Sequence, residues 1–93
     1  MANEELKKVI GHNVRRFRLK AGFSQAQLAE MVDRDASAIT NIEGGKRMVG
    51  VELLCSFAAI FSVSVDTLLQ IGERIRTSFI SVLEIKSRNM EFE

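Results

Sequence analysis

Residues 25–45, QAQLAEMVDRDASAITNIEGG, carry apolar side chains at helical spacing that is interrupted once, at residues 32–35, and then resumes. Ser24 precedes the stretch and Gln27 follows three residues later, which is the sequence signature of a capping box at the start of a helix. Asp35 is a favourable N-cap for a second helix, which the following glycine pair would end. The stretch therefore predicts two short helices joined by a turn of roughly three to four residues.

Helical periodicity also extends over the flanking sequence. Apolar residues recur at three- and four-residue steps over residues 4–20 and over about 51–61, and Ser64 is a suitable cap for one more short helix. The composition, with six Phe, no Trp, no Tyr and no Pro, favours aliphatic helix packing over a sheet. We therefore predict an all-α domain of five helices over residues 1–70.

Residues 71–93 exceed what these five helices need. Ile75, Phe79 and Leu83 recur at four-residue spacing, which favours a helix for this extension. The run SFISVLEIK within the same segment is also acceptable as a strand. We predict a helical C-terminal extension, with a strand as the alternative.

Two short helices joined by a tight turn form a helix-turn-helix, whose second helix can enter the major groove of DNA. Ile39 and Ile42 are expected to bury the inner face of that second helix. The outer face then carries four small side chains, those of Ala36, Ser37, Thr40 and Asn41. Three of them can form hydrogen bonds with base edges. An ordinary α-hairpin within a helical bundle is the alternative interpretation of this spacing.

Charge is distributed unevenly along the chain. Residues 1–50 contain nine Lys and Arg against six Asp and Glu, whereas residues 51–93 contain four against six. A polyanionic partner for the first half is one interpretation, and a mixed solvated surface is the other. The single cysteine suits a reducing cytoplasm, and no signal peptide or membrane-spanning run is evident. We expect a cytoplasmic protein without a membrane partner.

The sequence gives little support to catalytic or metal chemistry. His12, between Gly11 and Asn13, is expected on the polar side of the first helix, and Cys55 is expected as a buried core thiol. One His and one Cys provide no ligand set for zinc. The glycine pair at residues 44–45 lacks the lysine and hydroxyl residue of a phosphate-binding loop. We therefore expect no enzymatic activity, no cofactor, no metal and no small-molecule effector.

Three segments, IGHNVRRFRLKAGFSQAQLAEMV, SAITNIEGGKR and VELLCSFAAIFSVSVDTLL, carry a distinctive combination of residues. The markers are Arg18, Ser24-Gln25, Leu28-Ala29, Ile39, Ile42-Glu43, Gly45 and the closing VSVDTLL. This combination resembles the five-helix DNA-binding domain of the Xre, lambda-repressor and Cro-like family, over roughly residues 8 to 70. The sequence departs from the family pattern at Asp33, where glycine is usual, at Arg34, where an apolar residue is usual, and at Val49, where proline is common.

The resemblance implies roles for individual residues. The residues facing base edges would be Ala36, Ser37, Thr40 and Asn41. The residues contacting DNA phosphates would be Gln25, Lys46 and Arg47. Arg34 departs from the family pattern and would add a charge beside DNA, so it is a further predicted phosphate contact. Arg18 and Glu43 would form an ion pair that fixes the angle of the recognition helix.

The resemblance further implies a sequence-specific DNA-binding transcriptional regulator, with a repressor as the first expectation. One recognition helix reads only a few base pairs, so a homodimer on an inverted-repeat operator of double-stranded DNA is expected, with recognition helices ~34 Å apart. We predict a two-fold interface formed by the last helix and residues 71–93. Its predicted residues are Leu68, Ile71, Ile75, Phe79, Val82 and Leu83. A protein-interaction adaptor that has lost DNA contact is the alternative function.

Overall fold

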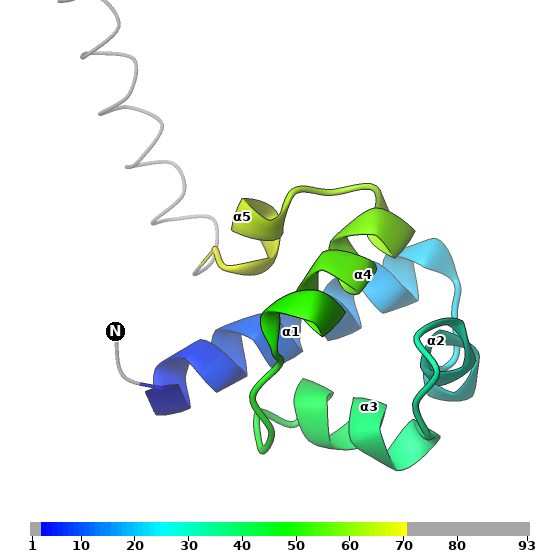
Figure 1. The fold of residues 1–93 in the computed structure, drawn as a ribbon, viewed down its shortest axis with the longest axis horizontal. Helices are drawn as coiled ribbons and strands as arrows, with labels where there is room; N and C mark the ends of the chain where they lie inside the picture. The colour runs from blue at the N-terminus through cyan, green and yellow to red at the C-terminus, as the bar shows by residue number, and fades with distance from the viewer. Residues whose placement is uncertain (1–2, 71–93) are drawn as a thin grey trace, which may run out of the picture.

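The computed structural model describes residues 3–70 of the chain. The elements are α1 (Asn3–Ala21), α2 (Gln25–Met31), α3 (Ala36–Glu43), α4 (Val51–Phe61) and α5 (Val65–Leu68). Within this part of the chain there is no strand. Helices α3 and α5 lie on opposite sides of α1, and α4 crosses over α1 (Figure 1). The predicted five-helix, all-α fold is confirmed, whereas the choice between helix and strand for 71–93 lies outside the described residues.

The helix starts follow from their capping side chains. The Ser24 hydroxyl accepts from the Gln27 amide at 3.0 Å, and Gln27 Oε1 accepts from the Ser24 amide at 2.8 Å, which completes the capping box of α2. Asp35 caps α3 by accepting from the Ala38 amide at 2.9 Å. Ser64 caps α5 in the same manner. Each cap satisfies an amide that the first helical turn leaves without a backbone acceptor.

Helices α1 to α4 share one type of C-terminal ending. A residue one or two positions beyond the end of each helix has positive φ, namely Gly22 (81°), Asp33 (56°), Gly45 (72°) and Ser62 (55°). The next amide then bonds to the carbonyl five residues earlier; for α2 this bond joins Arg34 N to Ala29 O at 2.9 Å. This is the Schellman arrangement. Asp33 therefore keeps the ending but places a residue with a side chain in the left-handed region.

The core lies where α1 meets the other helices. It consists of Ile10, Val14, Leu28, Ala29, Ile39, Ile42, Val49, Leu54, Phe57, Ala58 and Leu68. The expected burial of Ile39 and Ile42 on the inner face of α3 is therefore confirmed. Among the described residues, every buried side-chain nitrogen or oxygen has a hydrogen-bond partner.

Gly11 sets the distance between α1 and α3. A methyl group at this position would overlap the carbonyl oxygen of Ile42 and lie 3.1 Å from that of Glu43. Because both neighbours are backbone atoms of α3, no rotation of a side chain could make room. The interhelical contact thus requires glycine, a role that we did not predict from the sequence.

Asn13 is a buried polar residue of α1, whereas its neighbour His12 is exposed, as expected. Its Nδ2 donates to the carbonyl oxygens of Leu68 at 2.7 Å and Gln70 at 3.0 Å. The Asn13 amide thus donates the hydrogen bonds that water would otherwise donate to the carbonyl groups at the end of α5. These two hydrogen bonds hold the end of the described chain against the middle of α1.

Cys55 is exposed, so the prediction of a buried core thiol is wrong. Leu54, Phe57 and Ala58 face the core, because they are three to four positions apart on α4. Cys55 lies about a quarter turn from Leu54, on the same side as the exposed residue Val51. An apolar run does not by itself tell which of its members faces inward.

Leu68 is fully buried inside the domain, with 0% of its surface exposed. Its prediction as a dimer-interface residue is therefore wrong, because α5 uses this side chain to pack on α1 and α4. The other predicted interface residues lie outside the described residues. They are Ile71, Ile75, Phe79, Val82 and Leu83.

Candidate nucleic-acid interface

The outer face of α3 is open to a large partner. Its inner side chains, Ala38, Ile39 and Ile42, are buried against α1 and α2. The exposed side chains are those of Ala36, Ser37, Thr40 and Asn41. In Figure 1, α3 runs along one edge of the molecule. The structure therefore brings the four predicted base-contact residues to one exposed surface.

A buried ion pair fixes α3 to α1. Arg18 Nε donates to Glu43 Oε2 at 2.7 Å, and Nη2 donates to Oε1 at 3.0 Å. The third donor, Nη1, bonds to the Phe23 carbonyl at 2.9 Å. The side chains of Arg18 and Glu43 are only 9% and 4% exposed. The hydrogen bond to Glu43 raises the pKa of Arg18, so the guanidinium stays charged and the two-point contact holds the angle between the helices.

Gln25 joins α2 to α3 through both atoms of its amide. Its Nε2 donates to Glu43 Oε1 at 3.2 Å, and its Oε1 accepts from Thr40 Oγ1 at 2.9 Å. The side chain is half-buried at the start of α2. One hydrogen of Nε2 is left for an outside acceptor, which is compatible with the predicted phosphate contact.

The first turn of α3 contains a second short network. Ser37 Oγ donates to Asp35 Oδ1 at 2.8 Å, and the Ala38 amide donates to the same oxygen at 2.9 Å. These bonds, in that order, lower the pKa of the Asp35 carboxyl, and the positive charge of Arg47 adds a smaller effect in the same direction. The carboxylate is therefore ionised at neutral pH.

Basic side chains flank both ends of α3. Lys46 and Arg47 are exposed just after the helix, and Arg34 is exposed in the turn before it. The Arg34 guanidinium donates to the carbonyls of Val32 at 3.4 Å and Asp33 at 3.1 Å, so it folds back over its own turn. The predicted phosphate contacts thus lie on either side of the exposed face.

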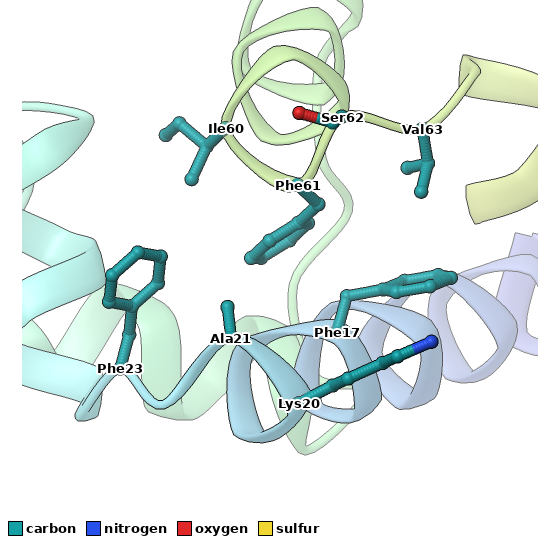
Figure 2. Close-up of a pocket in the computed structure, with 8 residues that line it drawn as sticks. All are labelled: Phe17, Lys20, Ala21, Phe23, Ile60, Phe61, Ser62 and Val63. Carbon is teal, nitrogen blue, oxygen red and sulfur yellow. The ribbon is translucent and has the colours of Figure 1, made fainter.

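A separate groove of about 360 Å³ lies between the ends of α1 and α4 (Figure 2). It is lined by Phe17, Lys20, Ala21, Phe23, Ile60, Phe61, Ser62 and Val63. The Phe17 and Phe61 rings stack with centroids 6.0 Å apart. Ligand sites combine apolar walls with several convergent polar groups, and only Lys20 and Ser62 carry polar side chains here. The outer face of α3 is therefore the stronger candidate for function.

A family model described as a helix-turn-helix domain matches residues 9–71. The chain belongs to this family. The match includes α2, the turn and α3. The comparison with curated proteins found no match.

Several solved structures share the fold. The clp gene regulator ClgR from C. glutamicum is 30% identical, with 69% of this chain and 83% of that chain covered and a TM-score of 0.64. The DNA-binding domain of BldD from S. venezulae is 29% identical, with 71% and 99% covered and a TM-score of 0.62. A hypothetical transcription factor from Neisseria, NHTF, is 24% identical over 85% and 90%, with a TM-score of 0.70, and supports the fold alone.

The family model and the neighbours of 29–30% identity support a DNA-binding transcriptional regulator. In the part of the chain that the structure describes, no helix has the length and apolar character needed to cross a membrane.

Proposed function

We propose that the protein is a sequence-specific repressor that binds an inverted-repeat operator as a homodimer, with α3 in the major groove. The observation that carries this proposal is the exposed face of α3, made of small side chains and held at a fixed angle by the buried Arg18–Glu43 pair. Small side chains allow the helix backbone to approach base edges closely. A fixed angle lets several contacts form at once.

Contacts to bases and to phosphates have different roles in this proposal. Ser37 and Asn41, one helical turn apart, point together into the groove beside Ala36 and Thr40. Asn41 can pair with adenine through N6 and N7. Phosphate contacts fix register without reading sequence. They are assigned to Gln25, Arg34, Lys46 and Arg47.

Two copies are needed because one α3 reads only a few base pairs. We assign DNA binding to residues 1–70 and self-association to residues 71–93, whose apolar residues Ile71, Ile75, Phe79, Val82 and Leu83 suit a two-fold interface. No small-molecule effector is part of the proposal, and a cytoplasmic location follows from the proposed DNA target.

The test compares two single variants on a duplex selected from a random library and on a scrambled duplex, at several salt concentrations. Asn41→Ala is expected to weaken cognate binding by about 1–3 kcal/mol and to relax preference at one base pair per half-site. Lys46→Ala is expected to weaken both duplexes alike and to reduce the steepness of the salt dependence by about one unit per half-site.

Equal weakening of both duplexes by Asn41→Ala would show that the recognition face is wrongly assigned. If neither substitution changed binding to any duplex, the adaptor function would be favoured instead. Steep salt dependence is the signature that separates the two, since release of counterions accompanies genuine phosphate contact.

A further inference from the structure

The Ser37 hydroxyl uses its only hydrogen inside the protein. A hydroxyl group has one hydrogen and two lone pairs, whereas an ionised carboxylate can only accept. Ser37 Oγ lies 2.8 Å from Asp35 Oδ1, so Ser37 must be the donor. The same oxygen also accepts from the Ala38 amide. What Ser37 presents to an outside partner is therefore a lone pair.

The Thr40 hydroxyl is engaged in the same way, through a chain of bonds that starts at the buried ion pair. The Glu43 carboxylate can only accept, so the amide nitrogen of Gln25 must face it, at 3.2 Å. The amide oxygen of Gln25 then faces Thr40 at 2.9 Å, and Thr40 must donate. The other atom within reach of this hydroxyl, the Ala36 carbonyl oxygen at 3.1 Å, is also an acceptor.

We propose that Ser37 and Thr40 act only as hydrogen-bond acceptors toward DNA, and so select the amino groups N6 of adenine and N4 of cytosine at the base pairs they face. In the major groove these are the donors, whereas O6 of guanine, O4 of thymine and N7 of either purine are acceptors. A keto oxygen opposite either hydroxyl would meet a lone pair and lose its hydrogen bond to water. The inference rests on the proposed function and specifies which chemical groups on the bases are selected.

Asn41 is the contrasting residue on the same face. Its side-chain amide carries both donors and an acceptor, and it is exposed. Asn41 can therefore donate a hydrogen bond to N7 of a purine, whereas the two hydroxyls have no free hydrogen to donate. Asp35 adds further hydrogen-bond acceptors at the first turn of α3, because its exposed carboxylate cannot donate.

The experiment uses the full chain and a duplex selected from a random library, in which bases are replaced one at a time by analogues. Purine in place of adenine, or 2-pyrimidinone in place of cytosine, removes the amino group; 7-deaza-adenine keeps the amino group and removes N7. At the positions facing Ser37 and Thr40, loss of the amino group is expected to weaken binding about tenfold. The 7-deaza analogue is expected to leave binding there unchanged but to weaken it at the position facing Asn41.

Single variants assign each effect to a residue. In Ser37→Ala the amino-group effect is expected to disappear at one position only, and in Thr40→Val at another, while Thr40→Ser keeps it. Circular dichroism of each variant checks that the helices are intact.

A selected site with guanine or thymine keto groups facing these hydroxyls would overturn the inference while leaving DNA binding in place. Amino-group effects that persist in both Ser37→Ala and Thr40→Val would overturn it as well. If no duplex binds, the proposed function fails and the inference fails with it.

Discussion

Glu43 is the residue on which the geometry of the recognition helix depends. One of its carboxylate oxygens accepts from Arg18 at 3.0 Å and from Gln25 at 3.2 Å, and the other accepts from Arg18 at 2.7 Å. Three helices are thus connected through one buried group. Removing ions from water offsets much of what such a pair gains, so its main effect is to define an angle.

Glu43→Ala is expected to lower the free energy of unfolding by about 3 kcal/mol, because Arg18 would remain buried without a counter-charge. Thermal and urea unfolding at fixed protein concentration measure this loss. Glu30→Ala, which removes an exposed carboxylate from α2, is the matched control and should change stability by less than about 0.5 kcal/mol. Equal stability of Glu43→Ala and wild type would show that the pair has no structural role.

Asp35 makes the stability of the fold depend on pH in the acid range, through the cap at the start of α3. Its pKa is lower in the folded chain than the usual value near 3.8, since Ser37 and the Ala38 amide bond to the charged form. A depressed folded pKa contributes stability that is present above the unfolded pKa and is lost as pH falls through the folded pKa. Melting temperatures measured from about pH 6 down to pH 2 should therefore fall less in Asp35→Asn than in wild type, because asparagine caps without titrating. Parallel curves for the two proteins would contradict this role.

At the scale of single elements, the turn between α2 and α3 contains a strained residue. Asp33 has φ of 56°, a conformation that is unfavourable for most L-residues but open to glycine. Asp33→Gly is expected to stabilise the fold by about 0.5–1 kcal/mol, net of the greater freedom of glycine in the unfolded chain. Asp33→Ala should act in the opposite direction. Urea unfolding measures the change in the free energy of unfolding for both variants. If Asp33→Ala were more stable than wild type, backbone strain could not be the cause.

The crossing of α1 and α3 is equally specific. Gly11→Ala would place a methyl group against the Ile42 carbonyl, so we expect a loss of about 2 kcal/mol despite the better helix propensity of alanine. His12→Ala, at the next and exposed position of α1, should leave stability within about 0.5 kcal/mol. A Gly11→Ala protein as stable as wild type would show that the helices can separate freely.

Features encoded locally were predictable from the sequence. The starts of α2, α3 and α5 follow from Ser24, Asp35 and Ser64, because an N-cap side chain acts within its own first turn. The inner face of α3 followed from the spacing of Ile39 and Ile42. The four residues proposed for base contact also lie together, since the periodicity of α3 places them on one exposed face.

Features that depend on distant partners were not predictable. Asn13 is buried only because the carbonyl end of α5, more than fifty residues away, needs donors. Gly11 is required by the backbone of α3, which no local pattern reveals. The orientation of α4 decides that Cys55 faces outward, and hydrophobicity alone could not supply that orientation.

In the described part of the chain, α3 and the end of α5 lie on opposite sides of α1 (Figure 1). The carbonyl of Gln70 is held by Asn13, so the described chain ends on the side away from α3. Self-association through residues 71–93 would then leave α3 free for DNA.

Sedimentation of the full chain is expected to show a dimer at micromolar concentration. Phe79→Glu should shift the population toward monomer, because a charge within an apolar interface is costly. Circular dichroism of the variant at the same concentration checks that the helical content is kept. A wild-type chain that sediments only as a monomer would contradict the proposed two-fold assembly.

The outward position of Cys55 gives the protein a ready attachment point for a spectroscopic reporter. It is the only cysteine in the sequence and lies exposed on α4, outside the face of α3. A maleimide dye would therefore label each chain once, without any engineered substitution. When chains labelled with a donor dye are mixed with chains labelled with an acceptor dye, a two-fold dimer would contain at most one donor–acceptor pair. Its energy transfer reports the distance between the two domains before and after an operator is added.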